Sequence, residues 1–117
     1  MTCLVVDDSK LARLSLIKSL NIHTQDAIIH QATNGLEAVE LATEHKPDLI
    51  FLDLTMPVMD GYEALPLLLQ ESSNSLVVVV SADVQERAKA KVLSLGAKMH
   101  IQKPINELKM KEILEQL

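Results

Sequence analysis

Short runs of apolar residues are spaced along the chain, and each is too short to form a helix. They are rich in valine and isoleucine, and they lie at residues 3–6, 27–29, 49–52, 77–80 and 99–101. Runs of this length and composition, bounded by turn residues, are typical of β-strands. The pattern therefore predicts five strands.

Between these runs, apolar residues recur at the spacing of a helix face. The sets are Leu11, Leu14, Ile17 and Leu20; Leu36, Val39 and Ala42; Val84, Ala88, Val92 and Leu95; and Leu108, Ile113 and Leu117. We expect a further helix from near Asp60 or Gly61, and Pro66 within it predicts a late start or a kink. Strict alternation of strands and helices indicates a parallel sheet covered on both faces.

The order of the strands follows from their polarity. Residues 49–52 and 77–80 are apolar without alternation, as strands buried on both faces must be, whereas residues 27–31 and 98–102 include polar side chains. The two mixed strands are predicted to be the edges. This gives an α/β fold with a doubly wound, five-stranded parallel sheet in the flavodoxin-like order 2-1-3-4-5. We expect residues 1–117 to form a single domain.

Composition excludes several classes of function. The net charge is −5, with two aromatic residues, so there is neither a basic surface for phosphates nor a stacking platform for bases. We therefore expect no direct binding to nucleic acid. The apolar runs are far shorter than the roughly 18 residues of a membrane helix, and no charged leader precedes one. The single cysteine, Cys3, fits a reducing compartment and should pack as a small apolar residue, so we expect a cytoplasmic protein.

Polar side chains mark the carboxyl ends of four predicted strands. Asp7 and Asp8 follow the first strand, Asp53 the third, Ser81 ends the fourth, and Lys103 follows the fifth. Ligand sites in open α/β sheets lie outside the carboxyl ends of the strands. We therefore expect these five residues to converge on one small region. His23, His30 and His45, in contrast, do not suggest a ligand set.

Three carboxylates in one place repel one another, so the cluster calls for a cation. With oxygen ligands alone, Mg²⁺ is favoured over Zn²⁺, and it keeps positions open for a phosphoryl oxygen. A carboxylate can accept a phosphoryl group, with a metal ion and a lysine neutralising its charge. Asp53 is the candidate nucleophile.

Each of these side chains also has a structural alternative. Asp8 and Ser9 could cap the helix that follows them, and Asp83 could cap the fourth helix. Ser81 could support a turn, and Lys103 could be a solvated surface lysine. Asp53 is harder to explain as a cap, because the next helix is expected to begin about seven residues later.

Taken together, the motifs resemble one protein family over nearly the whole chain. The matching segments are VVDDS at 5–9, NG at 34–35, DLTMPVMDG at 53–61, VVVSA at 78–82 and KP at 103–104. In this order and at these strand ends, they resemble the receiver domain of two-component response regulators.

The resemblance implies a role for each residue of the cluster. Asp53 would receive a phosphoryl group from a sensor histidine kinase or a phosphotransfer protein. Asp8, Asp53 and the backbone carbonyl of Thr55 would hold Mg²⁺, with Asp7 assisting directly or through water. Lys103 would pair with the phosphoryl oxygens. The chain would catalyse its own phosphotransfer and autodephosphorylation, and would not be a general metabolic enzyme.

The resemblance also implies how the signal is switched and timed. The Ser81 hydroxyl would move to the phosphoryl group, and His100 occupies the coupled switch position, where the family usually has Tyr or Phe. Histidine there could make switching depend on pH. Thr55 and Asp83 would tune the phosphoryl lifetime, and the Lys103–Pro104 peptide bond would be cis.

Output would pass through the surface formed by the fourth helix, the fifth strand and the last helix to an effector protein or domain. The chain would be a monomer or a phosphorylation-dependent dimer, in chemotaxis-like or transcriptional control. One alternative is an interaction module of the same fold that is not phosphorylated. A flavodoxin is disfavoured because Asp7 and Asp8 would repel its cofactor phosphate. An aspartate-nucleophile phosphatase of the haloacid dehalogenase type is disfavoured because Thr55 stands where its second Asp would be.

Overall fold

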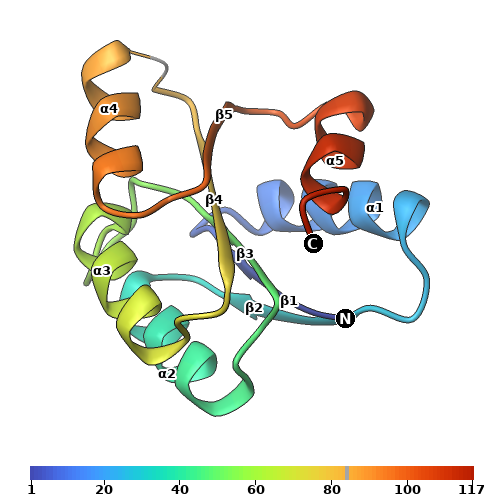
Figure 1. Cartoon of the computed structure of the whole chain (residues 1–117), viewed down its shortest axis with the longest axis horizontal. Helices are drawn as coiled ribbons and strands as arrows, with labels where there is room; N and C mark the ends of the chain where they lie inside the picture. Colours follow the sequence, from blue (N-terminus) through green and yellow to red (C-terminus); the bar gives the residue numbers. More distant parts are fainter. Residues whose placement is uncertain (84) are drawn as a thin grey trace.

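A computed structural model describes every residue of the chain except Val84, which the sequence analysis places on the fourth helix. Strands and helices alternate throughout (Figure 1). The strands are β1 (Thr2–Val6), β2 (Ile28–Ala32), β3 (Leu49–Leu52), β4 (Leu76–Ser81) and β5 (Met99–Gln102). The helices are α1 (Lys10–His23), α2 (Gly35–His45), α3 (Gly61–Glu71), α4 (Glu86–Ser94) and α5 (Glu107–Leu114).

The strands form one parallel sheet in the order β2-β1-β3-β4-β5, so the predicted topology is confirmed. Helices α1 and α5 cover one face, and α2, α3 and α4 cover the other (Figure 1). All four residues of β3 are buried, because this strand has neighbours on both sides and helices on both faces. In the register, Val6 lies beside Leu52, so β1 and β3 end at the same level.

Two apolar cores lie on the two faces of the sheet. Alternate residues of each strand point to opposite faces, so Leu4 joins the core under α2 and α3 while Cys3 and Val5 join the core under α1 and α5. Cys3 is fully buried and makes no disulfide, as predicted. Among the described residues, no helix combines the length and the apolar character needed to cross a membrane.

The apolar spacing located the helices better than it located their buried faces. In α1, Leu20 is fully buried, but Leu11 is 80% exposed and Leu14 46% exposed. These two leucines lie in the first half of the helix. Periodicity therefore identified the helix without showing how closely each turn approaches the sheet. Strand β2 also extends to Ala32, beyond the predicted run at 27–29, because an edge strand tolerates polar residues such as His30.

Helix α3 does not start late, so the late start predicted from Pro66 was wrong, and the alternative of a kink stays a prediction. The helix begins at Gly61, where the Asp60 side chain accepts a hydrogen bond from the Glu63 N–H at 2.9 Å. Pro66 lies inside the helix and cannot donate to the carbonyl four residues earlier. Burial of the flanking Leu65 and Leu68 against the sheet outweighs the lost hydrogen bond.

Helix α4 begins without the predicted side-chain cap. Its N-cap residue is Gln85, whose side chain makes no capping hydrogen bond. Asp83 instead accepts a hydrogen bond from the Gln85 N–H at 3.0 Å and stabilises the turn before the helix. The prediction that Asp83 caps the fourth helix was therefore wrong.

Candidate functional site

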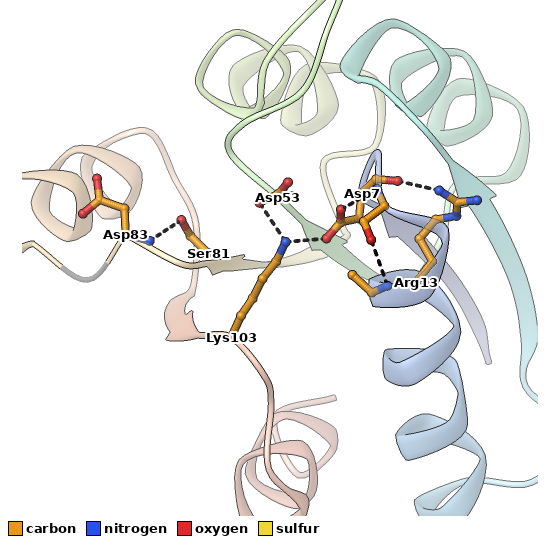
Figure 2. Close-up of polar contacts among 8 residues, drawn as sticks. Asp7, Arg13, Asp53, Ser81, Asp83 and Lys103 are labelled. Carbon is orange, nitrogen blue, oxygen red and sulfur yellow. Dashed lines mark hydrogen bonds and ion pairs between the residues drawn. The ribbon is translucent and has the colours of Figure 1, made fainter.

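The backbone of the sheet brings the predicted site residues together. The Asp53 N–H donates to the Val6 carbonyl at 3.0 Å, and the Lys103 N–H donates to the Ser81 carbonyl at 3.0 Å. These hydrogen bonds extend the ladder one residue beyond the strands. They fix Asp53 beside the end of β1 and Lys103 beside the end of β4, while the Asp7 N–H donates to the Ala32 carbonyl at 3.1 Å, so all three residues lie at the same edge of the sheet (Figure 2).

Lys103 joins the two buried carboxylates. Its Nζ lies 2.6 Å from Asp7 Oδ2 and 3.3 Å from Asp53 Oδ1 (Figure 2). Asp7 is 6% exposed and Asp53 7% exposed, so the charges face one another with little intervening solvent. The Lys103–Pro104 peptide bond is cis. Lys103 is therefore a member of the site, and its reading as a solvated surface lysine was wrong.

The environment raises the pKa of both Asp53 and Lys103, with opposite effects on their charges. Burial raises the pKa of the Asp53 carboxyl, the charge of Asp7 raises it further, and Lys103 offsets part of the rise. Burial alone would lower the pKa of the Lys103 ammonium, but the hydrogen bond that Lys103 donates to Asp7 and the charge of Asp53 outweigh burial and raise it. Lys103 is therefore held as a cation. Additional positive charge nearby would stabilise the ionised form of Asp53.

The acidic residues offer a set of ligands suited to a hard cation. Asp7, Asp8 and Asp53 each have a carboxylate oxygen, and these atoms all lie within 4.8 Å of one another. Asp7 already accepts hydrogen bonds at both oxygens, from the Ser9 N–H at 2.9 Å and from Lys103. Exposed Asp8 is open to solvent. The all-oxygen set, with two carboxylates buried and one exposed, fits Mg²⁺ that keeps several waters.

Ser81 lies beside this group at the end of β4. Ser81 is 4% exposed, and its Oγ accepts a hydrogen bond from the Asp83 N–H at 3.0 Å (Figure 2). The hydroxyl proton is left to donate to an anion. Ser81 therefore supports a turn, as one reading predicted, and keeps a donor available to the site.

His100 lies on the same face of the sheet as Ser81. Gln102 is the register partner of Ser81, and His100 stands two residues earlier, opposite Val79. The Nε2 atom of His100 is buried and has no hydrogen-bond partner among the described residues. This position links the end of β4 to the face that α4 covers.

Sequence reasoning missed two residues that hold the site in place. Arg13 Nη1 donates to the Asp7 carbonyl at 2.8 Å, and its Nε donates to Gln31 Oε1 at 2.9 Å. An added Cβ at Gly61 would clash with the Asp53 carbonyl oxygen and lie 2.8 Å from Leu54 Cα, so only glycine lets α3 begin this close to the Asp53 backbone. A basic residue one turn after the acidic pair was the available signal for Arg13. Gly61 looked like ordinary turn punctuation.

Comparison with known proteins places this arrangement in a family. The family model for the response regulator receiver domain matches residues 3–115. The chemotaxis protein CheY of Listeria monocytogenes is 38% identical over 112 residues, covering 96% of this chain and 93% of that protein. The CheY protein of Bacillus subtilis is 37% identical over 101 residues, covering 86% of this chain and 83% of that protein.

Comparison with solved structures indicates the same family. The structure of a CheX–CheY–BeF3–Mg²⁺ complex from Borrelia burgdorferi superposes with a TM-score of 0.90 at 30% identity, covering 99% of this chain and 87% of that chain. The response regulator domain of Thermotoga maritima CheB superposes with a TM-score of 0.83 at 34% identity, covering 99% of this chain and 92% of that chain. The chain belongs to the response regulator receiver domain family of two-component signalling.

Proposed function

We propose that Asp53 accepts a phosphoryl group from a phosphohistidine on a sensor histidine kinase or a phosphotransfer protein. An Asp53 carboxylate oxygen attacks phosphorus, the P–N bond to the donor histidine breaks, and its electron pair returns to the imidazole. The observation that carries the proposal is the contact of Lys103 Nζ with both Asp7 and Asp53, beside the exposed carboxylate of Asp8. We place this exchange in the cytoplasm.

The acidic residues would hold the Mg²⁺ ion that this transfer uses. Asp8, Asp53 and the backbone carbonyl of Thr55 would be direct ligands. Asp7 would assist directly or through water, because each of its oxygens already accepts one hydrogen bond and keeps a second lone pair. Bound Mg²⁺ would offset negative charge on the carboxylates and on the phosphoryl oxygens.

Lys103 and Ser81 would then change partners. Lys103 would turn from the carboxylates to a phosphoryl oxygen, and the Ser81 hydroxyl would donate to another. Moving a two-state equilibrium from 1:99 to 99:1 takes about 5.5 kcal/mol. A hydrogen bond to a charged group contributes roughly 1.5–3 kcal/mol, so the new Ser81 bond could supply a large part of it, and Lys103 would add the difference between its phosphoryl and carboxylate contacts.

Movement of Ser81 would be passed to the surface formed by α4, β5 and α5. The turn after β4 would follow Ser81, because the Asp83 N–H is bonded to its hydroxyl. His100 would adjust on the same face of β5. The altered surface would bind an effector protein or domain and would not bind nucleic acid directly. The chain would act as a monomer or as a phosphorylation-dependent dimer.

Thr55 and Asp83 would set the lifetime of the aspartyl phosphate. Both are exposed beside the site, where they can order or repel an attacking water. We expect Asp83→Ala to change the rate of phosphoryl loss, measured by intact mass over time after the donor is removed. A decay rate equal to wild type would remove Asp83 from this role.

Intact mass after incubation with Mg²⁺ and acetyl phosphate tests the proposed acceptor. Wild type should gain one phosphoryl group, and Asp53→Asn should gain none. Asp60→Asn is the matched control, because Asp60 is an acidic residue of the same loop that caps α3, and it should behave as wild type. Removal of Mg²⁺ with a chelator should abolish the gain. A phosphoryl group on Asp53→Asn, or none on folded wild type, would overturn the proposal.

A further inference from the structure

Arg13 joins three neighbouring elements beside the acidic residues. It lies on α1, and its Nη1 donates to the Asp7 carbonyl at 2.8 Å (Figure 2). Its Nε donates to Gln31 Oε1 at 2.9 Å, and Gln31 lies on the edge strand β2. The Asp7 N–H donates to the Ala32 carbonyl of the same strand at 3.1 Å. Both backbone polar groups of Asp7 are therefore tied to β2, one directly and the other through Arg13.

The carbonyl that Arg13 holds belongs to the peptide group between Asp7 and Asp8. Because a peptide group is planar, a fixed carbonyl also fixes the plane from which the chain enters Asp8. On the other side of Asp8, the Ser9 N–H donates to Asp7 Oδ1 at 2.9 Å. Asp8 itself is exposed, yet one of its carboxylate oxygens lies within 4.8 Å of oxygens of Asp7 and Asp53. The direction in which Asp8 meets Asp53 therefore depends on backbone contacts, one of which Arg13 supplies.

Arg13 acts on a cation at this site in two opposite ways. Its charge repels the cation, whereas its hydrogen bond holds a ligand in place. It donates to a backbone carbonyl and to an amide, so it leaves the carboxylate oxygens to the cation. The site faces solvent at Asp8, where water and salt screen the repulsion. We therefore expect the effect on geometry to outweigh the effect of charge.

We propose that Arg13 is a positioning residue for a cation held by the acidic residues, acting through the peptide group between Asp7 and Asp8. This role rests on the proposed function in one respect, the use of Asp8 as a direct Mg²⁺ ligand. Loss of a partner that orients a metal ligand typically lowers metal affinity roughly 10–100-fold. Arg13 holds the backbone beside the ligand, so we expect about tenfold, the lower end of this range. Gln31 would contribute less, because its contact is with Arg13.

Titrations of the unphosphorylated chain with Mg²⁺, followed by amide NMR spectra, test this role. Arg13→Met should weaken Mg²⁺ binding about tenfold, and Arg13→Lys less, because lysine keeps a charged donor on a long side chain. Gln31→Leu should weaken binding by a smaller factor. The double variant of Arg13→Met and Gln31→Leu should bind Mg²⁺ no more weakly than Arg13→Met, because both changes act through one contact. Independent structural effects would instead multiply.

Arg87→Met is the matched control, because it removes the same side chain and charge from an exposed position on α4. It should bind Mg²⁺ as wild type does. Amide spectra recorded without Mg²⁺ should show that each variant is folded. Gln31→Leu changes an exposed residue and tests the same contact if Arg13→Met does not fold.

Phosphorylation by acetyl phosphate separates positioning from catalysis. Arg13→Met should be phosphorylated slowly at low Mg²⁺ and at the wild-type rate at saturating Mg²⁺, with rates measured by intact mass. Unchanged or tighter Mg²⁺ binding by folded Arg13→Met, or a rate that stays low at saturating Mg²⁺, would overturn the positioning role. Absence of phosphorylation in wild type would overturn the proposed function alone, and the Mg²⁺ titrations would still decide the role of Arg13.

Discussion

The segments that follow β3 and β4 both leave the sheet near Lys103, yet they are held very differently. After β3, the Gly61 N–H donates to the Leu54 carbonyl at 2.9 Å, and Asp60 caps α3 with its side chain. After β4, the N-cap residue Gln85 makes no side-chain bond, and the described residues at 82–87 are all exposed.

This difference indicates that the two segments have different roles. Asp53, the proposed acceptor, must stay in register with Asp7 and Lys103, and the tight return at Gly61 fixes its backbone. Segments with few buried contacts open at low free energy, and switching elements come from such segments. We therefore propose that the turn after β4 is the part of the site that moves.

Substitution of Gly61 should have the largest effect on stability, because Gly61 lies in the segment after β3 whose backbone is held in place. In Gly61→Ala the new Cβ would lie 2.8 Å from Leu54 Cα, with backbone on both sides and no flexible atom to yield. We expect a loss of about 3 kcal/mol in the free energy of unfolding, measured by urea denaturation. The matched one-methyl change after β4, Ala82→Gly, should stay within about 0.5 kcal/mol. Equal losses in the two variants would contradict the comparison.

Removal of the shared cation should have the next largest effect. Lys103→Met leaves Asp7 and Asp53 facing each other, so without Mg²⁺ it should lower the free energy of unfolding at pH 7 by about 2 kcal/mol. Millimolar Mg²⁺ should restore most of the loss. The loss should shrink as pH falls through the raised pKa of Asp53, because a protonated carboxyl needs no cation. Lys98→Met, at an exposed position, is the control, and a loss unaffected by Mg²⁺ would count against this account.

Neutralising Asp53 should stabilise the folded chain. The pKa of Asp53 is raised by burial above the ordinary value of 3.8, so the folded state binds more protons between these two values. Wild type therefore loses stability as pH rises through that window. Without Mg²⁺, Asp53→Asn should be more stable at pH 7 by on the order of 1 kcal/mol and indistinguishable near pH 3. Thermal unfolding across pH measures this, and a less stable variant at pH 7 would show the opposite sign.

The two helix starts should differ by a smaller amount. Asp60→Ala removes the hydrogen bond to the Glu63 N–H and should cost about 1 kcal/mol. Gln85→Ala removes no capping bond and should leave the urea midpoint unchanged. If Gln85→Ala cost as much as Asp60→Ala, α4 would be as firmly anchored as α3.

Much of this arrangement could be predicted from the sequence. Uninterrupted apolar runs identified the central strands, mixed runs identified the edges, and the resulting order brought the strand-end residues together. Local chemistry was less predictable. Both Asp83 and Gln85 precede α4, and the sequence did not show that Gln85 is the N-cap. Pro66 is tolerated in α3 because Leu65 and Leu68 are buried. Contacts that depend on packing, such as those of Arg13 with the Asp7 carbonyl and with Gln31, leave little trace in the order of residues.

The central claim is that a phosphoryl group on Asp53 acts through Ser81 on α4, β5 and α5 while α3 stays fixed. Amide NMR spectra with Mg²⁺, with and without the phosphoryl mimic beryllofluoride, test this claim most directly. In wild type and in the control Ser94→Ala, signals from α4, β5 and α5 should shift while those of Leu65–Glu71 stay in place. In Ser81→Ala the shifts in α4, β5 and α5 should be lost. A full shift in Ser81→Ala, or equal shifts in α3 and α4, would contradict the account.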